Sequence, residues 1–354
     1  MPRTSRRVSN RGSNRRVRLV SRNGKDWTKE FPQVAYAVGR LPAVTALLDG
    51  EVAAVLPSGA TSFQALQKRA SFYPDLGFTK LDLALYYVTI ADAVLPHLDG
   101  RPLTLVRCPD GIGGETFYQK HPGFWTPPQV RRFVVPGKAE EYLYVDSVPG
   151  LVALAQVAIL EIHPWNSRAG RLEEPDQVIF DLDPDEALPF SRVAAAARHV
   201  RALLTERGLE SFVKTTGGKG LHVCVPLELR HGWEELTEFT RAVAQRLARD
   251  EPETFTASML KSHRKGKVYV DYLRNVRGAN AVGPFSTRAR EGAPVSFPVG
   301  WDELDRLSGP RDFTVAEVPL RVLGWTSGRA VDPWAQYRKV KQRVPASLTR
   351  DLAG

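Results

Sequence analysis

Residues 178–184, VIFDLDP, decide the fold and the site, because an apolar run ends there in two acids separated by one residue. Side chains alternate between the faces of a strand, so Asp181 and Asp183 should project from the same face of a sheet. Two carboxylates held that close repel each other unless a cation lies between them. A hard divalent cation such as Mg²⁺ or Mn²⁺ takes oxygen ligands of this kind. The alternative is that Asp183 caps a following helix, and the motif by itself leaves both interpretations open.

A third acid, Asp271, lies in a second apolar and aromatic stretch, residues 267–275 (KVYVDYLRN). A carboxylate inside a strand suited to burial is costly unless it pairs with a cation. Asp271 could therefore pair with an arginine, or it could complete a three-carboxylate metal site with Asp181 and Asp183. Sites of that kind in two-metal phosphoryl transfer activate a 3′-hydroxyl and stabilise the departing pyrophosphate. The nearby arginines that could pair with Asp271 or neutralise a triphosphate are Arg264, Arg274, Arg277, Arg288 and Arg290.

Residues 214–223, KTTGGKGLHV, predict a tight glycine turn between two strands. Glycines allow backbone N–H groups to converge on an anion, to which Lys219 would add a positive charge and Thr216 a hydroxyl donor. His222 alternates with apolar neighbours and should face the opposite side of its strand. A plain hairpin with a structural histidine explains the same residues. The spacing differs from that of a P-loop, so a P-loop nucleotide triphosphatase is not supported.

Two further motifs suggest contacts with the end of a nucleic acid. Lys80 stands at the predicted start of a helix, where its charge and the N-terminal amides could together bind a terminal phosphate. In residues 117–121 (FYQKH), Phe117 and Tyr118 precede two basic residues, an arrangement that suits base stacking beside positive charge. Aromatic pairs also occur in cores, so a structural role stays open. His163 is similarly ambiguous on its own.

The composition is that of a globular protein of 354 residues with a net charge of +10. Residues 1–22 hold eight arginines and no acid, which predicts a disordered basic arm suited to a phosphate backbone. No apolar run approaches the ~20 residues that span a bilayer, and no secretory signal opens the chain. The two cysteines form no C-x-x-C pair, which fits a reducing cytosol.

Helices are predicted for residues 79–98, 191–207 and 233–249, the second ending at Gly208. Between them, apolar segments separated by Gly- and Pro-rich turns predict strands. The main predicted strands are residues 102–109, 141–148, 178–183, 211–215, 221–227 and 267–273.

Taken together, these motifs resemble the polymerase domain of bacterial ligase D, an end-joining enzyme whose polymerase belongs to the archaeo-eukaryotic primase superfamily. The resemblance begins near Tyr73 and extends to the C-terminus. Its order and spacing are specific. The segments that carry it are YPDLGFTKLDL (73–83), LVRCPDG (105–111), FYQKH (117–121), EIHPWN (161–166), VIFDLDP (178–184), KTTGGKGLHVCVPL (214–227), VDYLRN (270–275), RGANAVGPFSTRAREGAPVS (277–296) and FTVAEVP (313–319).

The resemblance implies an α+β fold with a mixed or antiparallel catalytic sheet flanked by helices. It implies that Asp181, Asp183 and Asp271 are catalytic and bind two Mn²⁺ or Mg²⁺ ions, with a nucleoside triphosphate as substrate. It also implies a preference for ribonucleotides. Nucleotide-binding residues by resemblance are His163, Thr216, Lys219, His222, Arg274 and Arg288. Contacts to DNA would come from Lys80 at a 5′-phosphate, from Phe117 on a template base, and from Tyr118.

The first 67 residues depart from this family. Residues 21–33 and 47–67 resemble pieces of the nucleotidyltransferase domain of an ATP-dependent DNA ligase, yet residues 1–17 hold no lysine that could serve as its nucleophile. We therefore divide the chain into a basic arm (1–17), a ligase-like remnant (18–67) and a polymerase domain (68–354). No ligase activity is expected.

The sequence thus predicts a DNA-repair nucleotidyltransferase that adds nucleotides to 3′ ends at gaps or double-strand breaks in bacterial non-homologous end joining. Its expected partners are DNA ends with a 5′-phosphate, the end-binding protein Ku and a separate ligase, with no membrane. The expected location is the bacterial cytoplasm, at the nucleoid. Two alternatives are a non-catalytic module that bridges DNA ends and a primase that starts chains de novo.

Overall fold

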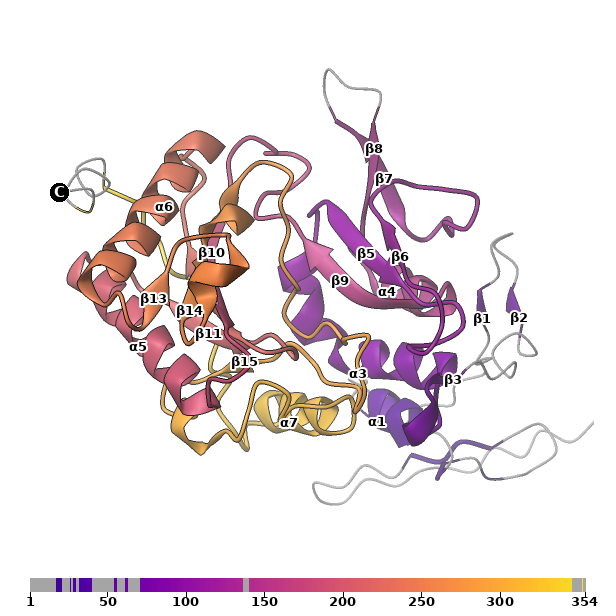
Figure 1. The fold of residues 1–354 in the computed structure, drawn as a ribbon. Helices are drawn as coiled ribbons and strands as arrows, with labels where there is room; N and C mark the ends of the chain where they lie inside the picture. Colours follow the sequence, from indigo (N-terminus) through magenta and orange to yellow (C-terminus); the bar gives the residue numbers. More distant parts are fainter. Residues whose placement is uncertain are drawn as a thin grey trace, which may run out of the picture.

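The computed structural model describes residues 71–135 and 140–345, together with Leu352 and short pieces before residue 71 (17–20, 26, 28–29, 32–39, 54–55 and 61–62). Two sheets lie side by side, one of six strands and one of five (Figure 1). Helices α5 and α6 cover the six-stranded sheet, and α3 and α4 lie beside the five-stranded one. The predicted α+β class with a mixed, mainly antiparallel sheet is confirmed.

The six-stranded sheet has β10 (Gln177–Pro184) near its centre, in the order β13-β14-β10-β12-β11-β15. All its pairs are antiparallel except β13 with β14. The other strands are β11 (Phe212–Thr215), β12 (Leu221–Pro226), β13 (Phe255–Thr256), β14 (Val268–Asp271) and β15 (Pro298–Val299). One face is apolar, with Val178, Phe180 and Leu182 fully buried. The face that carries Asp181 and Asp183 is therefore left for the site.

Helices α5 (Phe190–Glu206) and α6 (Trp233–Asp250) pack on the apolar face. In α5 the buried positions include Val193, Ala197, Val200 and Leu204, the stripe that its periodicity predicted. The helix stops where Gly208 takes a φ of 74°, a left-handed conformation that glycine adopts without steric cost.

The five-stranded sheet follows the order β6-β5-β8-β7, with β9 paired to the other side of β5. Its strands are β5 (Leu103–Arg107), β6 (Phe117–Gln119), β7 (Arg131–Val134), β8 (Glu141–Tyr144) and β9 (Ile159–Pro164). Helices α3 (Lys80–Leu98) and α4 (Val148–Gln156) pack against each other beside it. A short antiparallel pair, β3 (Ser71–Tyr73) and β4 (Phe78–Thr79), leads into α3.

Helix α3 begins at a capping box in which Thr79 and Asp82 satisfy each other's backbone amides. By length and composition α3 could cross a membrane, so the expectation that no apolar segment approaches that length is wrong. Half of its apolar window is buried inside the protein, with Leu83, Tyr87 and Ile90 fully enclosed. Its hydrophobicity is thus accounted for by the core.

Two segments join the sheets and close the fold. Residues 283–288 run along β9, where Gly283 N donates to Ile162 O (2.9 Å) and Ile162 N to Ser286 Oγ (2.8 Å). After α7 (Glu317–Thr326), the C-terminal segment lies across the six-stranded sheet. There Trp334 Nε1 donates to Val213 O (3.0 Å) and Tyr337 OH to Gln177 Oε1 (2.7 Å). These bonds fix the sheet face beside the acids.

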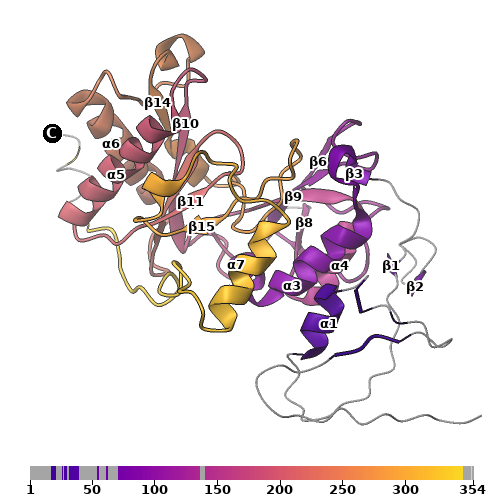
Figure 2. The same ribbon diagram turned by 90° about the horizontal axis from the view of Figure 1, so that it is seen from below.

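Two of the N-terminal pieces contact the helices beside the five-stranded sheet, α1 (Pro32–Gly39) on α3 and β1 (Ala54–Val55) on α4 (Figure 2). Strand β1 pairs antiparallel with β2 (Thr61–Ser62) as a hairpin. The predicted basic arm, save Val17, lies outside the described residues, as does most of the predicted ligase-like remnant. The division at residues 17 and 67 therefore stays a prediction.

Candidate active site

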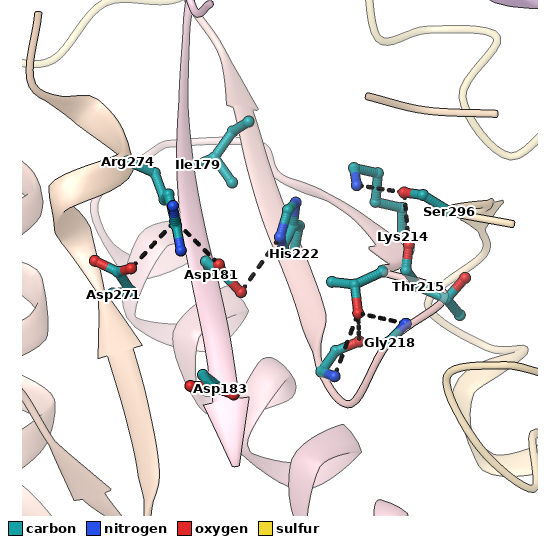
Figure 3. Close-up of polar contacts among 12 residues, drawn as sticks. Ile179, Asp181, Asp183, Lys214, Thr215, Gly218, His222, Asp271, Arg274 and Ser296 are labelled. Carbon is teal, nitrogen blue, oxygen red and sulfur yellow. Dashed lines mark hydrogen bonds and ion pairs between the residues drawn. The ribbon is translucent and has the colours of Figure 1, made fainter. Parts of the chain in front are cut away.

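Strand register aligns four polar side chains in one row across the six-stranded sheet. Asp181 lies opposite Asp271 on β14 and opposite His222 on β12, and His222 in turn lies opposite Lys214 on β11. We call Asp271, Asp181, His222 and Lys214 the polar row (Figure 3). All four side chains belong to one face, because directly paired residues of antiparallel strands point the same way. Residues 90 positions apart are thus brought together by pairing alone.

Arg274 stands between the two acids of the polar row. Its Nε lies 3.2 Å from Asp181 Oδ2 and 3.1 Å from Asp271 Oδ2. The suggested arginine partner of Asp271 is therefore present. Burial alone would raise the pKa of Asp181, but the interactions with His222, Arg274 and Lys214 outweigh it and hold that pKa well below its usual range. Burial and the neighbouring Asp181 raise the pKa of Asp271 in spite of Arg274.

Asp183 lies one step further along β10 and is half exposed. Arg264 Nη1 lies 3.2 Å from its Oδ2, while the guanidinium of Arg264 stacks 3.7 Å from the ring centre of Tyr269. Burial and repulsion by Asp181 raise the pKa of Asp183. Asp183 does not cap α5, which begins seven residues later at Phe190, with Pro189 at the N-cap position. The interpretation of Asp183 as a helix cap is therefore wrong.

The three acids offer only hard oxygen donors, which suit Mg²⁺ or Mn²⁺. Within the described residues, however, no group of three or more His, Cys, Asp or Glu side chains converges as a metal site. Arg274 and Arg264 lie beside these carboxylates and compensate their charge. The donor chemistry of the three acids fits the predicted ions.

The glycine turn between β11 and β12 is held by Thr216. Its Oγ1 donates to Gly220 O (2.9 Å) and accepts from Gly218 N (3.1 Å), so the hydroxyl is committed to the turn. The expectation that Thr216 offers a free donor to an anion is wrong in this conformation. A Cβ at Gly220 would lie 1.9 Å from Leu182 O, so only glycine lets the turn approach β10 this closely. Lys219 forms an ion pair with Glu186 at the exposed rim.

Two fully buried members of the polar row, His222 and Lys214, have pKa values below their ordinary ones. Burial, together with the nearby Lys214, lowers the pKa of His222 to about 4. Burial also lowers the pKa of Lys214 to about 8, and its Nζ donates to Ser296 Oγ (2.6 Å). His222 is therefore neutral at pH 7, with Nε2 3.3 Å from Asp181 Oδ1 and with Nδ1 buried and lacking a hydrogen-bond partner among the described residues.

A cavity of about 500 Å³ opens above this row. It is lined by the three acids and by basic side chains from several elements, a mixture that suits a polyanion together with cations. Among the described residues, Nε of Arg264 is buried there without a hydrogen-bond partner. The site candidates that line it are His163, Asp181, Asp183, Thr216, Lys219, His222, Asp271, Arg274 and Arg288, joined by Arg264 and Arg290.

The three predicted DNA contacts lie outside this lining, beside the five-stranded sheet. Lys80 is the first residue of α3, and burial with the nearby Arg107 lowers its pKa. The capping box already uses the amides of Thr79 and Asp82, so the phosphate would meet fewer free amides than predicted. Phe117 and Tyr118 are neighbours on β6 and point to opposite faces, with Tyr118 74% exposed. They therefore do not form one continuous platform.

Two site residues were missed by the sequence analysis. Lys214 precedes the glycine turn and alternates with buried apolar positions, so its place on the His222 face could have been read from the strand pattern. Glu161 is two residues from His163 on β9 and shares its face. The spacing in residues 161–163 (EIH) was the signal that could have found it.

Acids from adjacent strands facing a cavity lined by arginines define a class of site suited to metal-assisted phosphoryl transfer. Residues 79–329 match the family described as LigD, primase-polymerase domain. The chain belongs to this family, the primase-polymerase domain of LigD.

Curated relatives agree with this assignment. The chain is 45% identical over 282 residues to the multifunctional non-homologous end joining protein LigD of Pseudomonas aeruginosa, covering 79% of this chain and 33% of that protein. It is 30% identical over 277 residues to the bifunctional LigD of Bacillus subtilis, covering 74% and 45%. The chain thus spans about a third to under a half of the length of these curated relatives.

Among solved structures, the polymerase domain of Mycobacterium tuberculosis ligase D in complex with DNA matches with a TM-score of 0.68 and 35% identity. The match covers 75% of this chain and 94% of that one. The predicted primase-polymerase fold is confirmed. The family match begins at residue 79 and leaves the ligase-like interpretation of residues 18–67 a prediction.

Proposed function

We propose that this chain extends DNA 3′ ends by nucleotidyl transfer during the repair of gaps and double-strand breaks. The observation that carries the proposal is the alignment of Asp271, Asp181 and His222 beneath a cavity lined by arginines. In the reaction the 3′-oxygen of a DNA end attacks the α-phosphorus of a nucleoside triphosphate. The bond from the α-phosphorus to the oxygen that joins it to the β-phosphate breaks, and pyrophosphate leaves with that oxygen. The proton of the 3′-hydroxyl is lost to solvent.

Asp181, Asp183 and Asp271 would hold two divalent ions, Mn²⁺ or Mg²⁺. Such ions lower the pKa of a bound hydroxyl and neutralise the charge of pyrophosphate. For these ligands to become available, Arg274 must leave its place between Asp181 and Asp271. A triphosphate supplies a better destination for the guanidinium, because phosphate oxygens accept bidentate hydrogen bonds from arginine. Substrate binding and the exposure of the acids are then coupled.

The basic side chains around the cavity would bind the triphosphate. Lys219 reaches it from the glycine turn, Arg288 from the segment that leads to β15, and His163 from β9. The buried Nδ1 of His222, which has no hydrogen-bond partner among the described residues, is a further candidate for a ligand contact. A polyanion would satisfy groups that are costly to leave unpaired.

Binding of the DNA would use the surface around β6 and the start of α3. Tyr118 presents an exposed ring on this surface. Lys80 would contact a 5′-phosphate, and Phe117 and Tyr118 would stack on bases. The DNA complex of the mycobacterial relative supports a nucleic-acid partner.

The finer features of the proposal follow the family resemblance. We expect ribonucleotides to be preferred, Mn²⁺ to support the highest rate, and Ku with a separate ligase to act beside this chain in the bacterial cytoplasm. Salt should weaken DNA binding, because neutralised phosphates release counterions.

The test is extension of a primer on a gapped duplex, with and without a 5′-phosphate at the gap, using ribonucleotides against deoxyribonucleotides. The proposal expects metal-dependent addition that is faster with the phosphate. Binding of the duplex without any addition would instead support an end-bridging module. Synthesis on a template without a primer would support a primase.

A further inference from the structure

Glu161 is a buried acid at the edge of the cavity whose contacts join two of the predicted nucleotide-binding residues. Its Oε2 lies 2.7 Å from His163 Nε2, and its Oε1 lies 3.0 Å from Arg288 Nε. Oε1 also accepts a hydrogen bond from Ala289 N (2.9 Å). Burial alone would raise the pKa of Glu161, but His163, Arg288 and the amide of Ala289 outweigh it and lower that pKa to about 2. Glu161 is therefore ionised at neutral pH.

These contacts cross the junction between the two sheets. Glu161 and His163 belong to β9 of the five-stranded sheet, whereas Arg288 belongs to the segment that leads to β15 of the six-stranded sheet. The same junction is supported by Tyr73, whose hydroxyl donates to Arg288 O (2.6 Å). Tyr73 thus holds the backbone of Arg288, and Glu161 holds the side chain of Arg288.

The contacts leave defined atoms available to a ligand. Arg288 Nη1 donates to Thr216 O (2.5 Å) and Nε faces Glu161, and no contact described for Arg288 uses Nη2. His163 directs Nε2 to Glu161, so its Nδ1 is the ring nitrogen left for another partner. A long arginine side chain loses much rotamer freedom on binding, and prior anchoring reduces that loss. Glu161 therefore holds the side chain of Arg288 in position before the nucleotide binds.

We propose that Glu161 is a positioning residue of the nucleotide site, which fixes Arg288 and His163 across the sheet junction so that they receive the triphosphate of the incoming nucleotide. This inference rests on the proposed function. It predicts that the loss of the Glu161 charge weakens nucleotide binding, because Arg288 loses the partner that directs its guanidinium into the cavity.

The test compares Glu161→Gln with the wild-type protein in two measurements. In gap filling, the apparent KM for the nucleotide should rise about 10-fold while kcat stays within about twofold, the pattern of an interaction used equally in ground and transition states. In equilibrium titration with ATP and Mn²⁺, without DNA, affinity should fall by a similar factor. Glu161→Asp, which keeps the charge, should recover part of the loss.

A matched control is Asp176→Asn, which removes another acid that pairs with two arginines, Arg101 (2.6 Å) and Arg168 (3.0 Å), away from the cavity. It should leave the KM unchanged even if it lowers the melting temperature. Because Glu161 acts through Arg288 as well as His163, Glu161→Gln should change the KM by a smaller factor in an Arg288→Ala background than in the wild-type protein.

An unchanged KM and ATP affinity in a folded Glu161→Gln protein would overturn the inference, as would an equally large effect in the Arg288→Ala background. Failure of the proposed function gives a different result. In that case the wild-type protein would bind ATP without extending DNA, and the ATP titration would still decide the role of Glu161. A wild-type protein that binds no ATP would overturn both.

Discussion

The two sheets present their functional side chains in opposite ways. On the six-stranded sheet the polar row is buried, with Lys214 and His222 at 0% and 2% exposure, and its charges compensate each other. On the five-stranded sheet, the side chain of Tyr118 is 74% exposed, so it contributes little to the packing of the core. The contrast indicates that the candidate active site is built in advance with internal counter-ions, whereas the surface that we propose for DNA is left open. Substitutions in the first region should therefore act through packing strain and charge. Substitutions in the second should act through lost contact area with DNA.

The largest expected effect comes from closing the space between the glycine turn and β10. In Gly220→Ala the new Cβ would meet Leu182 O at 1.9 Å, so the turn must move away from the strand that carries the acids. We expect a loss of about 3 kcal/mol in unfolding free energy together with the loss of extension. Urea unfolding measures the first effect. Gly170→Ala is the control, since the added Cβ would meet no atom of the described residues within 4 Å. Equal stability of the two variants would contradict the packing argument.

Lys214 tests whether buried charge in the polar row costs stability. Its pKa in the folded protein is about 8, against an ordinary value of 10.5, so the folded state releases the proton first. The resulting penalty is full below about pH 8 and is relieved as the pH rises towards 10.5. Lys214→Met should therefore raise the unfolding free energy at pH 7 by up to about 3 kcal/mol, while slowing extension.

Denaturant unfolding of both proteins from pH 7 to pH 10 checks this prediction. The difference in stability between Lys214→Met and the wild-type protein should shrink with rising pH. A constant difference would show that the Lys214 charge is not the source of the penalty.

Arg274 tests whether the acids are held by an internal cation. In Arg274→Gln, Asp181 and Asp271 lose the guanidinium between them, and Mn²⁺ no longer has to displace it. Calorimetric titration without nucleotide should give about a 5-fold higher Mn²⁺ affinity, whereas extension should slow because a triphosphate contact is lost. Arg277→Gln, which removes an arginine paired with Glu173 outside the cavity lining, should change neither. A weaker Mn²⁺ affinity in Arg274→Gln would contradict the account.

Tyr118 tests the open region and should give the smallest effect on the protein itself. Tyr118→Ala removes an exposed ring, so the melting temperature should stay unchanged while affinity for a gapped duplex falls about 10-fold. Fluorescence anisotropy with labelled duplex measures the affinity. Val134→Ala is a control on the same sheet, where a 56% exposed apolar side chain is shortened, and it should bind DNA normally. Equal losses in both variants would indicate a general surface effect instead of stacking.

Local patterns in the sequence predicted much of the fold. Alternation in VIFDLDP placed Asp181 and Asp183 on one face, and apolar periodicity predicted α5 to within one residue at each end, with Gly208 as its stop. The family resemblance supplied the overall fold. The sequence could not reveal which cation stands beside which acid, since Arg274 meets Asp181 only through the pairing of β10 with β14. The link from Glu161 to Arg288 was missed for the same reason, because Arg288 lies 127 positions away in the segment that leads to β15.

The most direct test of the central claim is single-nucleotide gap filling with Mn²⁺ by Asp181→Ala and Asp185→Asn. Asp185 is an acid directly after β10. Its carboxylate accepts hydrogen bonds from the backbone amides of Ala187 and Gly266, and it does not line the cavity. The account predicts that Asp181→Ala loses extension by about 1,000-fold or more while keeping most of its affinity for the duplex, and that Asp185→Asn extends normally. Extension by Asp181→Ala at the wild-type rate would contradict the account.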